Sequence, residues 1–163
     1  MITTVAELPA IRKRFAHKRI VFTCGTFDLI HPGHVDFLAW CKQQGDMLVV
    51  AVNPDHLVRL KKGPARPIQN DVDRMQMVVA LKPVNYVVQK KDAANSRIAS
   101  MLTAQALQPD IIVLGHDWAD DEIEEWLTRL PTAQIVVGPR RAVGRSTSNL
   151  IETIRRKHGE TTA

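Results

Sequence analysis

The segment RIVFTCGTFDLIHPGH, residues 19–34, decides the expected fold of this chain. Residues 19–24 form an uninterrupted run rich in β-branched and aromatic side chains, which is typical of a strand buried on both faces. Gly25 ends this run, and the dipeptide at 32–33, Pro-Gly, suits the first turn of a helix that would end near Gly45. The segment therefore predicts a strand, a turn and a helix in immediate succession.

The same alternation continues along the chain. Further strands are expected over residues 47–52, 85–88, 110–114 and 134–137. Helices are expected over residues 4–15, 71–81, 93–107, 120–130 and 146–157, a turn and helix start at residues 53–55, and a loop over residues 61–67. Apolar strands that alternate with helices predict a parallel sheet covered on both faces. The expected fold is a single Rossmann-like α/β domain of three layers, spanning residues 1–163 with its core at about 19–157 and a five-stranded parallel sheet.

The composition and charge of the chain are those of an ordinary globular domain with a net positive charge. Of 163 residues, 45% are hydrophobic and 24% charged, as in ordinary globular domains. The net charge of +5 is compatible with nucleic acid, a phosphorylated ligand, an anionic membrane surface or a solvated basic surface. Cys24 and Cys41 lack redox or zinc spacing and indicate buried thiols in a reducing compartment. Without a signal-peptide pattern or a long apolar run, we expect a cytoplasmic protein with no membrane contact.

The connection after the first strand has the properties of an anion site. Free N–H groups at a helix start favour an anion, and His31 and His34 can face the same side of that turn. Zinc is disfavoured because no further Cys or His partner is evident, and a purely structural histidine pair remains open. A P-loop is excluded because its sequence pattern does not occur. The connection therefore predicts a cradle for a phosphate chain.

The ten residues 25–34, GTFDLIHPGH, resemble the G-x-F-D-x-x-H-x-G-H signature of the cytidylyltransferase-like nucleotidyltransferases. This family is related, through its H-x-G-H element, to class I aminoacyl-tRNA synthetases. The resemblance implies that His31 and His34 are catalytic. It also implies nucleotide contacts from four neighbours in the same loop: Thr26, Phe27, Asp28 and Gly33.

Two segments further along resemble the family in the same order. Residues 59–67, RLKKGPARP, resemble a basic loop in which a lysine meets the triphosphate. Lys61 and Lys62 both qualify as that catalytic lysine, and the alignment between them is ambiguous. Residues 71–75, DVDRM, resemble a helix start at which the arginine, here Arg74, faces the nucleotide.

The last two matching segments follow the fourth and fifth expected strands. In GHDW, residues 115–118, the resemblance implies that Gly115 and Asp117 bind nucleotide and that Trp118 binds the acceptor substrate. Residues 141–148, RAVGRSTS, resemble a phosphate-binding segment. A helix start that carries hydroxyl and guanidinium groups also favours an anion on physical grounds. The nucleotide-binding residues implied there are Arg141, Ser146 and Thr147.

The resemblance implies a reaction in which a phosphate oxygen of the acceptor attacks the α-phosphorus of a nucleoside triphosphate and pyrophosphate leaves. A phosphate nucleophile is already anionic, so the task of the protein is positioning and charge stabilisation. Mg²⁺ is expected to bind mainly through the oxygens of the triphosphate and water. Asp28 and Trp118 are the expected contacts to the acceptor.

The substrates are less sharply indicated than the reaction. Residues 115–118 look most like glycerol-3-phosphate cytidylyltransferases, which favours CTP and a polyol or sugar phosphate. Residues 59–75 and 146–154 also resemble heptose-1-phosphate adenylyltransferases, so ATP and heptose 1-phosphate are the alternative, and FAD synthesis is a third. A non-catalytic nucleotide-binding regulator is a rival from another class, and nucleic-acid binding is disfavoured because aromatic stacking residues are few. Family members are commonly dimers, so a homodimer is expected.

Overall fold

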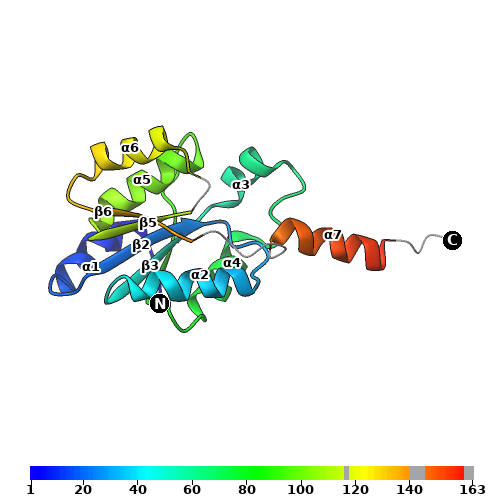
Figure 1. Ribbon diagram of the computed structural model, residues 1–163, viewed down its shortest axis with the longest axis horizontal. Coiled ribbons are helices and arrows are strands. Elements are labelled where there is room, and N and C mark those ends of the chain that lie inside the picture. The colour runs from blue at the N-terminus through cyan, green and yellow to red at the C-terminus, as the bar shows by residue number, and fades with distance from the viewer. Residues whose placement is uncertain (116–117, 140–145, 160–163) are drawn as a thin grey trace.

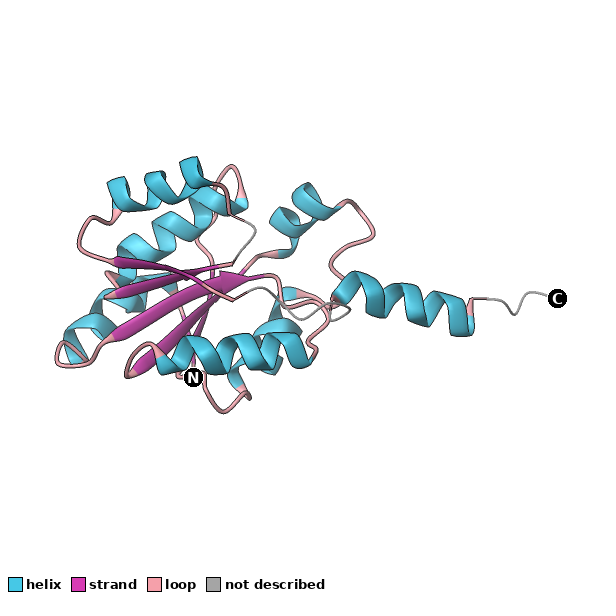
Figure 2. Cartoon of the chain, in the orientation of Figure 1, coloured by secondary structure: helices cyan, strands magenta, loops and turns pink. Residues whose placement is uncertain are grey.

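The structure is a computed structural model of the chain, and it describes residues 1–115, 118–139 and 146–159. These residues form three layers, with a parallel sheet between helices on its two faces (Figures 1 and 2). The expected α/β arrangement around a parallel sheet is therefore confirmed.

The sheet has six strands within the described residues, and the expected number of five was wrong. The order across the sheet is β1-β4-β3-β2-β5-β6. The strands are β1 Ile2–Thr3, β2 Ile20–Gly25, β3 Met47–Val52, β4 Tyr86–Gln89, β5 Ile111–Leu114 and β6 Gln134–Val137. The additional strand is β1, which pairs in parallel with β4. A strand of two residues is too short to produce a recognisable alternation of side chains.

The helices match the expected order, with differences at their ends. They are the 3₁₀ turn η1 Val5–Glu7, α1 Leu8–Arg14, α2 Pro32–Gln43, α3 Asp55–Lys62, α4 Asp71–Val79, α5 Ser96–Leu107, α6 Asp120–Arg129 and α7 Thr147–His158. Lys61 and Lys62 belong to the last turn of α3 rather than to the expected loop, because the chain leaves the helix only at Gly63, where φ is +87°. None of the described helices is both long and apolar enough to cross a membrane.

Apolar side chains on the two faces of the sheet form two cores. In β2, Phe22 belongs to the core beneath α1, α5 and α6, while its neighbour Val21 belongs to the core beneath α2 and α4. Trp126 of α6 is fully buried in the first core, and Leu38 of α2 in the second. This alternation explains why the central strands are apolar throughout.

The strand order determines where a ligand can bind. From β2, the strands β3, β4 and β1 extend to one side of the sheet, and β5 and β6 extend to the other. In open parallel sheets, ligands bind beyond the carboxyl ends of the strands at such a reversal of order. Helix α7 follows the last strand and projects away from the body of the domain (Figure 1), with no buried residue of its own.

Candidate active site

A polar cavity of about 210 Å³ lies at the carboxyl ends of the central strands. It brings together many of the residues predicted from the sequence, which come from segments more than 100 positions apart. The predicted residues that line it are Thr26, Phe27, Asp28, His34, Lys61, Lys62, Gly115, Trp118 and Thr147. Asp117 and Arg141 lie outside the described residues, so their predicted contacts stay predictions.

The two motif histidines lie against each other at the start of α2. His31 is the N-cap residue and His34 is in the first turn, and their ring centroids are 3.9 Å apart. Both are buried, and the backbone N–H of His31 donates to Nδ1 of His34 at 3.4 Å. A neutral His34 that accepts through Nδ1 carries its proton on Nε2. His34 lines the cavity and can therefore present an N–H donor to it, whereas the predicted residues His31 and Gly33 are not among its lining residues.

Phe27 also packs against His34. Its ring centroid is 5.4 Å from that of His34, and Phe27 itself is buried in a left-handed backbone conformation with φ +55°. The ring passes so close to Gly25 that a Cβ there would lie 2.9 Å from it. A side chain at position 25 would thus displace the Phe27 ring that packs against His34.

Asp28 holds the loop that follows α3. Its buried carboxylate accepts hydrogen bonds from Nε of Arg66 at 2.8 Å and from the backbone N–H groups of Ile68 and Gln69 at 3.0 and 2.9 Å. Burial alone would raise the pKa of Asp28, but these donors outweigh burial and lower the pKa below its ordinary value. Both carboxylate oxygens of Asp28, which the sequence predicted to contact substrate, therefore already accept hydrogen bonds within the protein. In this arrangement Asp28 positions the loop.

Arg74 has a different environment from the one expected. Its side chain is fully buried, and its guanidinium donates to the backbone oxygens of Gln69, Thr26 and Asn53 and to the carboxylate of Asp55, at 2.6 to 3.0 Å. A buried guanidinium needs such acceptors to offset its desolvation. Arg74 therefore joins the connections after β2 and β3, and the predicted direct contact with nucleotide does not fit this arrangement.

The remaining predicted residues surround the cavity from α3 and α7. Lys61 and Lys62 both line it, so the structure does not separate the two candidates. Ser146 caps α7, since its hydroxyl accepts from the backbone N–H of Asn149 at 3.2 Å. Thr147 lines the cavity, and its hydroxyl donates to the backbone oxygen of Leu29 at 3.3 Å. The start of α7 is thereby attached to the histidine loop, 118 residues away in the chain.

Three polar residues of the cavity were missed by sequence reasoning: Asn53, Lys90 and Ser96. Cys24 also lines the cavity and is only partly buried, contrary to the expectation of two buried thiols, whereas Cys41 is buried as expected. Lys90 follows β4 directly, as Asn53 follows β3. Asn53 directly follows the expected strand 47–52, and Lys90 lies two positions beyond the expected strand 85–88, so polar residues close to the ends of the expected strands were the signal that could have identified both.

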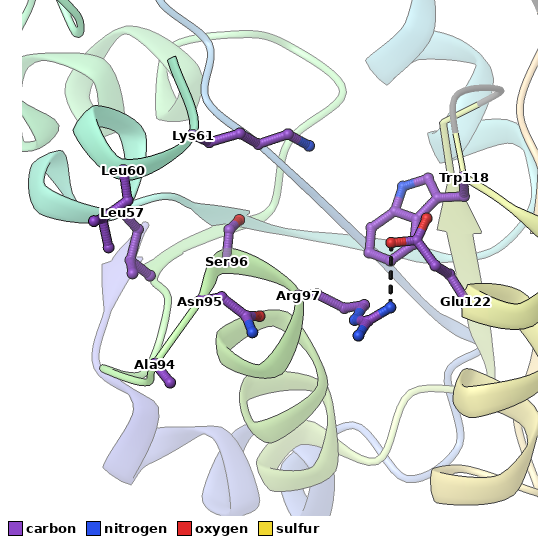
Figure 3. A pocket seen from close by; sticks show the side chains of 9 residues that line it. All are labelled: Leu57, Leu60, Lys61, Ala94, Asn95, Ser96, Arg97, Trp118 and Glu122. Carbon is purple, nitrogen blue, oxygen red and sulfur yellow. Dashed lines mark hydrogen bonds and ion pairs between the residues drawn. The ribbon is translucent and has the colours of Figure 1, made fainter. Parts of the chain in front are cut away.

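A second cavity, of about 500 Å³, adjoins the first over the start of α5 (Figure 3). The two cavities share three lining residues: Lys61, Ser96 and Trp118. Leu57 and Leu60 of α3 face it from one side, and Arg97 pairs with Glu122 at 3.4 Å on the other. The combination of apolar walls and a few polar groups is typical of a small-molecule site.

The described residues contain no group of three or more His, Cys, Asp or Glu side chains that could hold a metal ion. The side chains that line the 210 Å³ cavity are instead rich in cationic and hydroxyl groups, which suit phosphate oxygens. Binding of Mg²⁺ mainly through the oxygens of a triphosphate stays a prediction.

Comparison with known proteins agrees with the motif. The family model described as cytidylyltransferase-like matches residues 22–162. The bifunctional protein HldE of Azorhizobium caulinodans is 39% identical over 137 residues, which cover 84% of this chain and 28% of HldE. HldE of Helicobacter pylori strain HPAG1 is 37% identical over 145 residues, which cover 88% of this chain and 29% of HldE. The chain thus spans less than a third of the length of these relatives.

Solved structures give the same fold. The lipopolysaccharide core biosynthesis protein from Thermoplasma volcanium superposes with a TM-score of 0.66 at 29% identity, covering 77% of this chain and 99% of that protein. The pantoate-beta-alanine ligase of Francisella tularensis superposes with a TM-score of 0.61 at 16% identity, over 100% of this chain and 82% of the ligase, and shows the fold alone. From the motif, its place in the fold and the match over residues 22–162, the chain belongs to the cytidylyltransferase-like family of nucleotidyltransferases.

Proposed function

We propose that this chain transfers a nucleoside monophosphate from a nucleoside triphosphate to the phosphate of a sugar phosphate and releases pyrophosphate. The observation that carries the proposal is the single cavity shared by His34, the α3 lysines and Thr147. A histidine donor, two ammonium groups and a helix start surround one space at the reversal of strand order. That set matches a phosphate chain better than an uncharged ligand.

The chemical step is a substitution at phosphorus. An oxygen of the acceptor phosphate forms a new bond to the α-phosphorus while the bond from that phosphorus to the β-phosphate bridging oxygen breaks. The acceptor oxygen is already ionised near neutral pH, so no residue has to remove a proton. The protein contributes by holding the two phosphates in line and by stabilising the charge of the transition state.

The histidine loop, the end of α3 and the start of α7 each supply a role in this step. His34 donates from Nε2 to a non-bridging oxygen of the α-phosphate, and His31 keeps the His34 ring in place. Lys61 or Lys62 neutralises the increasing negative charge. Thr147 and the N–H groups at the start of α7 hold the leaving pyrophosphate, with Arg141 expected to assist. Mg²⁺, when bound to the triphosphate, supplies further charge neutralisation.

ATP and heptose 1-phosphate are the best supported substrates. The support is the 34–39% identity to HldE proteins over most of this chain, together with the second cavity, which offers more room than a three-carbon acceptor needs. CTP and glycerol 3-phosphate, which the sequence favoured, remain the second candidate because Trp118 of the GHDW segment lines both cavities. An assembly as a homodimer and a cytoplasmic location stay predictions.

The deciding experiment is a substrate panel with pyrophosphate release as the readout. ATP, CTP and GTP are each combined with heptose 1-phosphate, glycerol 3-phosphate and FMN. We expect the fastest release with ATP and heptose 1-phosphate. Release with CTP alone would overturn the choice of nucleotide, and release with CTP and glycerol 3-phosphate would identify the second candidate. Release with ATP and FMN would instead indicate FAD synthesis. Tight nucleotide binding without release for any acceptor would overturn catalysis in favour of a regulator.

A further inference from the structure

Lys90 is a buried cation at the edge of the cavity. It follows β4, its exposed fraction is 5%, and its ammonium group contacts Ser96, whose hydroxyl and backbone oxygen accept at 3.1 and 3.4 Å. Within the described ranges, no carboxylate forms an ion pair with it. A buried charge that is solvated only by neutral groups is costly, and an anionic ligand would offset that cost.

The partners of Lys90 form a directed chain of hydrogen bonds. The Ser96 hydroxyl accepts from Lys90 and donates to Oδ1 of Asn53 at 2.7 Å. The Asn53 amide in turn donates to the Thr26 hydroxyl at 3.0 Å. The chain connects the ends of β4, β3 and β2, and it fixes the position of the Lys90 ammonium relative to the histidine loop. The lysine is thus held by the scaffold rather than freely mobile.

Burial lowers the pKa of Lys90, and the nearby charge of Lys61 lowers it further, although the neighbouring Cys24 acts in the opposite direction. An anion in the cavity would restore the charged form. The lowered pKa agrees with the geometry, since both indicate that the Lys90 ammonium lacks, among the described residues, a negatively charged partner that an anionic ligand would supply.

The cavity has two halves that meet at β2. Lys90, Ser96 and Asn53 come from the side of β3 and β4, whereas Gly115 and Thr147 come from the side of β5 and β6 or the helix that follows. In an in-line transfer, the attacking and leaving groups lie on opposite sides of the α-phosphorus. If the start of α7 holds the leaving pyrophosphate, the attacking phosphate must approach from the half that contains Lys90.

We propose that Lys90 binds the phosphate of the acceptor and thereby selects a phosphorylated acceptor over a neutral one. This inference rests on the proposed nucleotidyl transfer. The remainder of the acceptor then extends past Ser96 into the second cavity, between Leu57 and Trp118 (Figure 3). The Trp118 ring offers a flat apolar face there, and the Arg97–Glu122 pair offers polar groups for hydroxyls.

The kinetic test compares Lys90→Met with Lys91→Met. Lys91 is the adjacent lysine, but it is exposed and lines neither cavity, so it is a matched control for loss of charge. For Lys90→Met we expect the KM for the acceptor to rise about 10- to 100-fold, the effect of losing one hydrogen bond to a charged group. The KM for the nucleoside triphosphate should change little. Lys90→Gln, which keeps a donor for Ser96, should likewise raise the KM for the acceptor and leave the KM for the triphosphate almost unchanged. It replaces Lys90→Met if that variant does not fold.

A binding test separates this inference from the proposed reaction. Calorimetric titration with inorganic phosphate, without nucleotide, should give much weaker binding to Lys90→Met than to the wild type and Lys91→Met. If no acceptor is turned over but this difference is present, the anion subsite stands and the reaction is wrong. If turnover continues with an unchanged acceptor KM, or if the KM for the triphosphate rises equally, the subsite is wrong and the reaction stands. Equal phosphate binding by all three proteins would also overturn the subsite.

Discussion

Asp28 and Arg66, 38 residues apart in the chain, form an ion pair of 2.8 Å in which the Asp28 side chain is completely buried and that of Arg66 is 12% exposed. The guanidinium also donates to the backbone oxygen of Asp28. The pair joins the histidine loop to the loop that follows α3, and α3 carries Lys61 at its end. The position of Lys61 relative to His34, both of which line the 210 Å³ cavity, therefore depends on this pair.

Loss of the Asp28 carboxylate should lower the stability of the whole domain. Asp28→Asn removes the charge that pairs with Arg66, and breaking one side of a buried pair costs about 3 kcal/mol in the free energy of unfolding. Urea unfolding followed by circular dichroism measures this loss. Asp92→Asn is the matched control, because the Asp92 carboxylate is 84% exposed in its pair with His56 and should contribute little. Equal effects of the two substitutions would contradict the positioning role of Asp28.

The same carboxylate predicts a dependence of stability on pH. Because the pKa of Asp28 is lower in the folded protein than in the unfolded chain, its contribution is fully present above the unfolded pKa of about 4. The contribution is lost as the pH falls through the folded pKa. In acid titrations of the unfolding free energy, the difference between wild type and Asp28→Asn should therefore shrink below about pH 4. A difference that stays constant to lower pH would mean that Asp28 does not titrate with folding.

His34→Ala should reduce turnover strongly while leaving the fold intact. The substitution removes the Nε2 donor from the cavity, and loss of one donor to a developing oxyanion costs on the order of 100-fold in kcat. Pyrophosphate release at saturating substrates measures the effect. His56→Ala is the control, since His56 is exposed and lines neither of the two adjoining cavities. A folded His34→Ala protein with normal turnover would exclude the assignment.

Substitution of Arg74 distinguishes a buried structural role, as found in the structure, from the direct nucleotide contact expected from the sequence. Because its guanidinium is buried and bound to four acceptors, Arg74→Met should cost about 3 kcal/mol or more in unfolding free energy. The KM for nucleotide, measured on the folded fraction at low temperature, should change less than the stability. A stable Arg74→Met protein with a greatly raised nucleotide KM would instead support the direct contact expected from the sequence.

The two cysteines should differ in reactivity towards alkylating reagents. Burial raises the pKa of Cys41 to about 12 and leaves it as an enclosed thiol, whereas Cys24 lines the cavity. N-ethylmaleimide should therefore modify Cys24 first, and a bound nucleoside triphosphate should slow that modification. Peptide mass spectrometry identifies the site, and Cys24→Ser should abolish the fast phase. Modification of Cys41 at the same rate would contradict this placement of the thiols.

Several parts of the site could be read from local sequence. The apolar runs that became β2 and β3, and Pro32 at the first position of α2, depend on neighbours within a few residues. The same holds for Ser146, whose cap on α7 is closed by an N–H three residues away. Such features are visible in a sequence because the interacting groups lie in the same short segment.

The amino-acid sequence by itself determined the order of the helices and of strands β2 to β6, the histidine loop and the family, because each depends on patterns within a short segment. The tertiary structure decided the partners of Asp28 and Arg74, the pairing of β1 with β4 and the burial of Lys90 in the cavity. All four depend on backbone carbonyls, N–H groups and strand ends that are distant in the chain. The packing of the sheet determines which of these groups meet, and the periodicity of side chains along the sequence does not predict it.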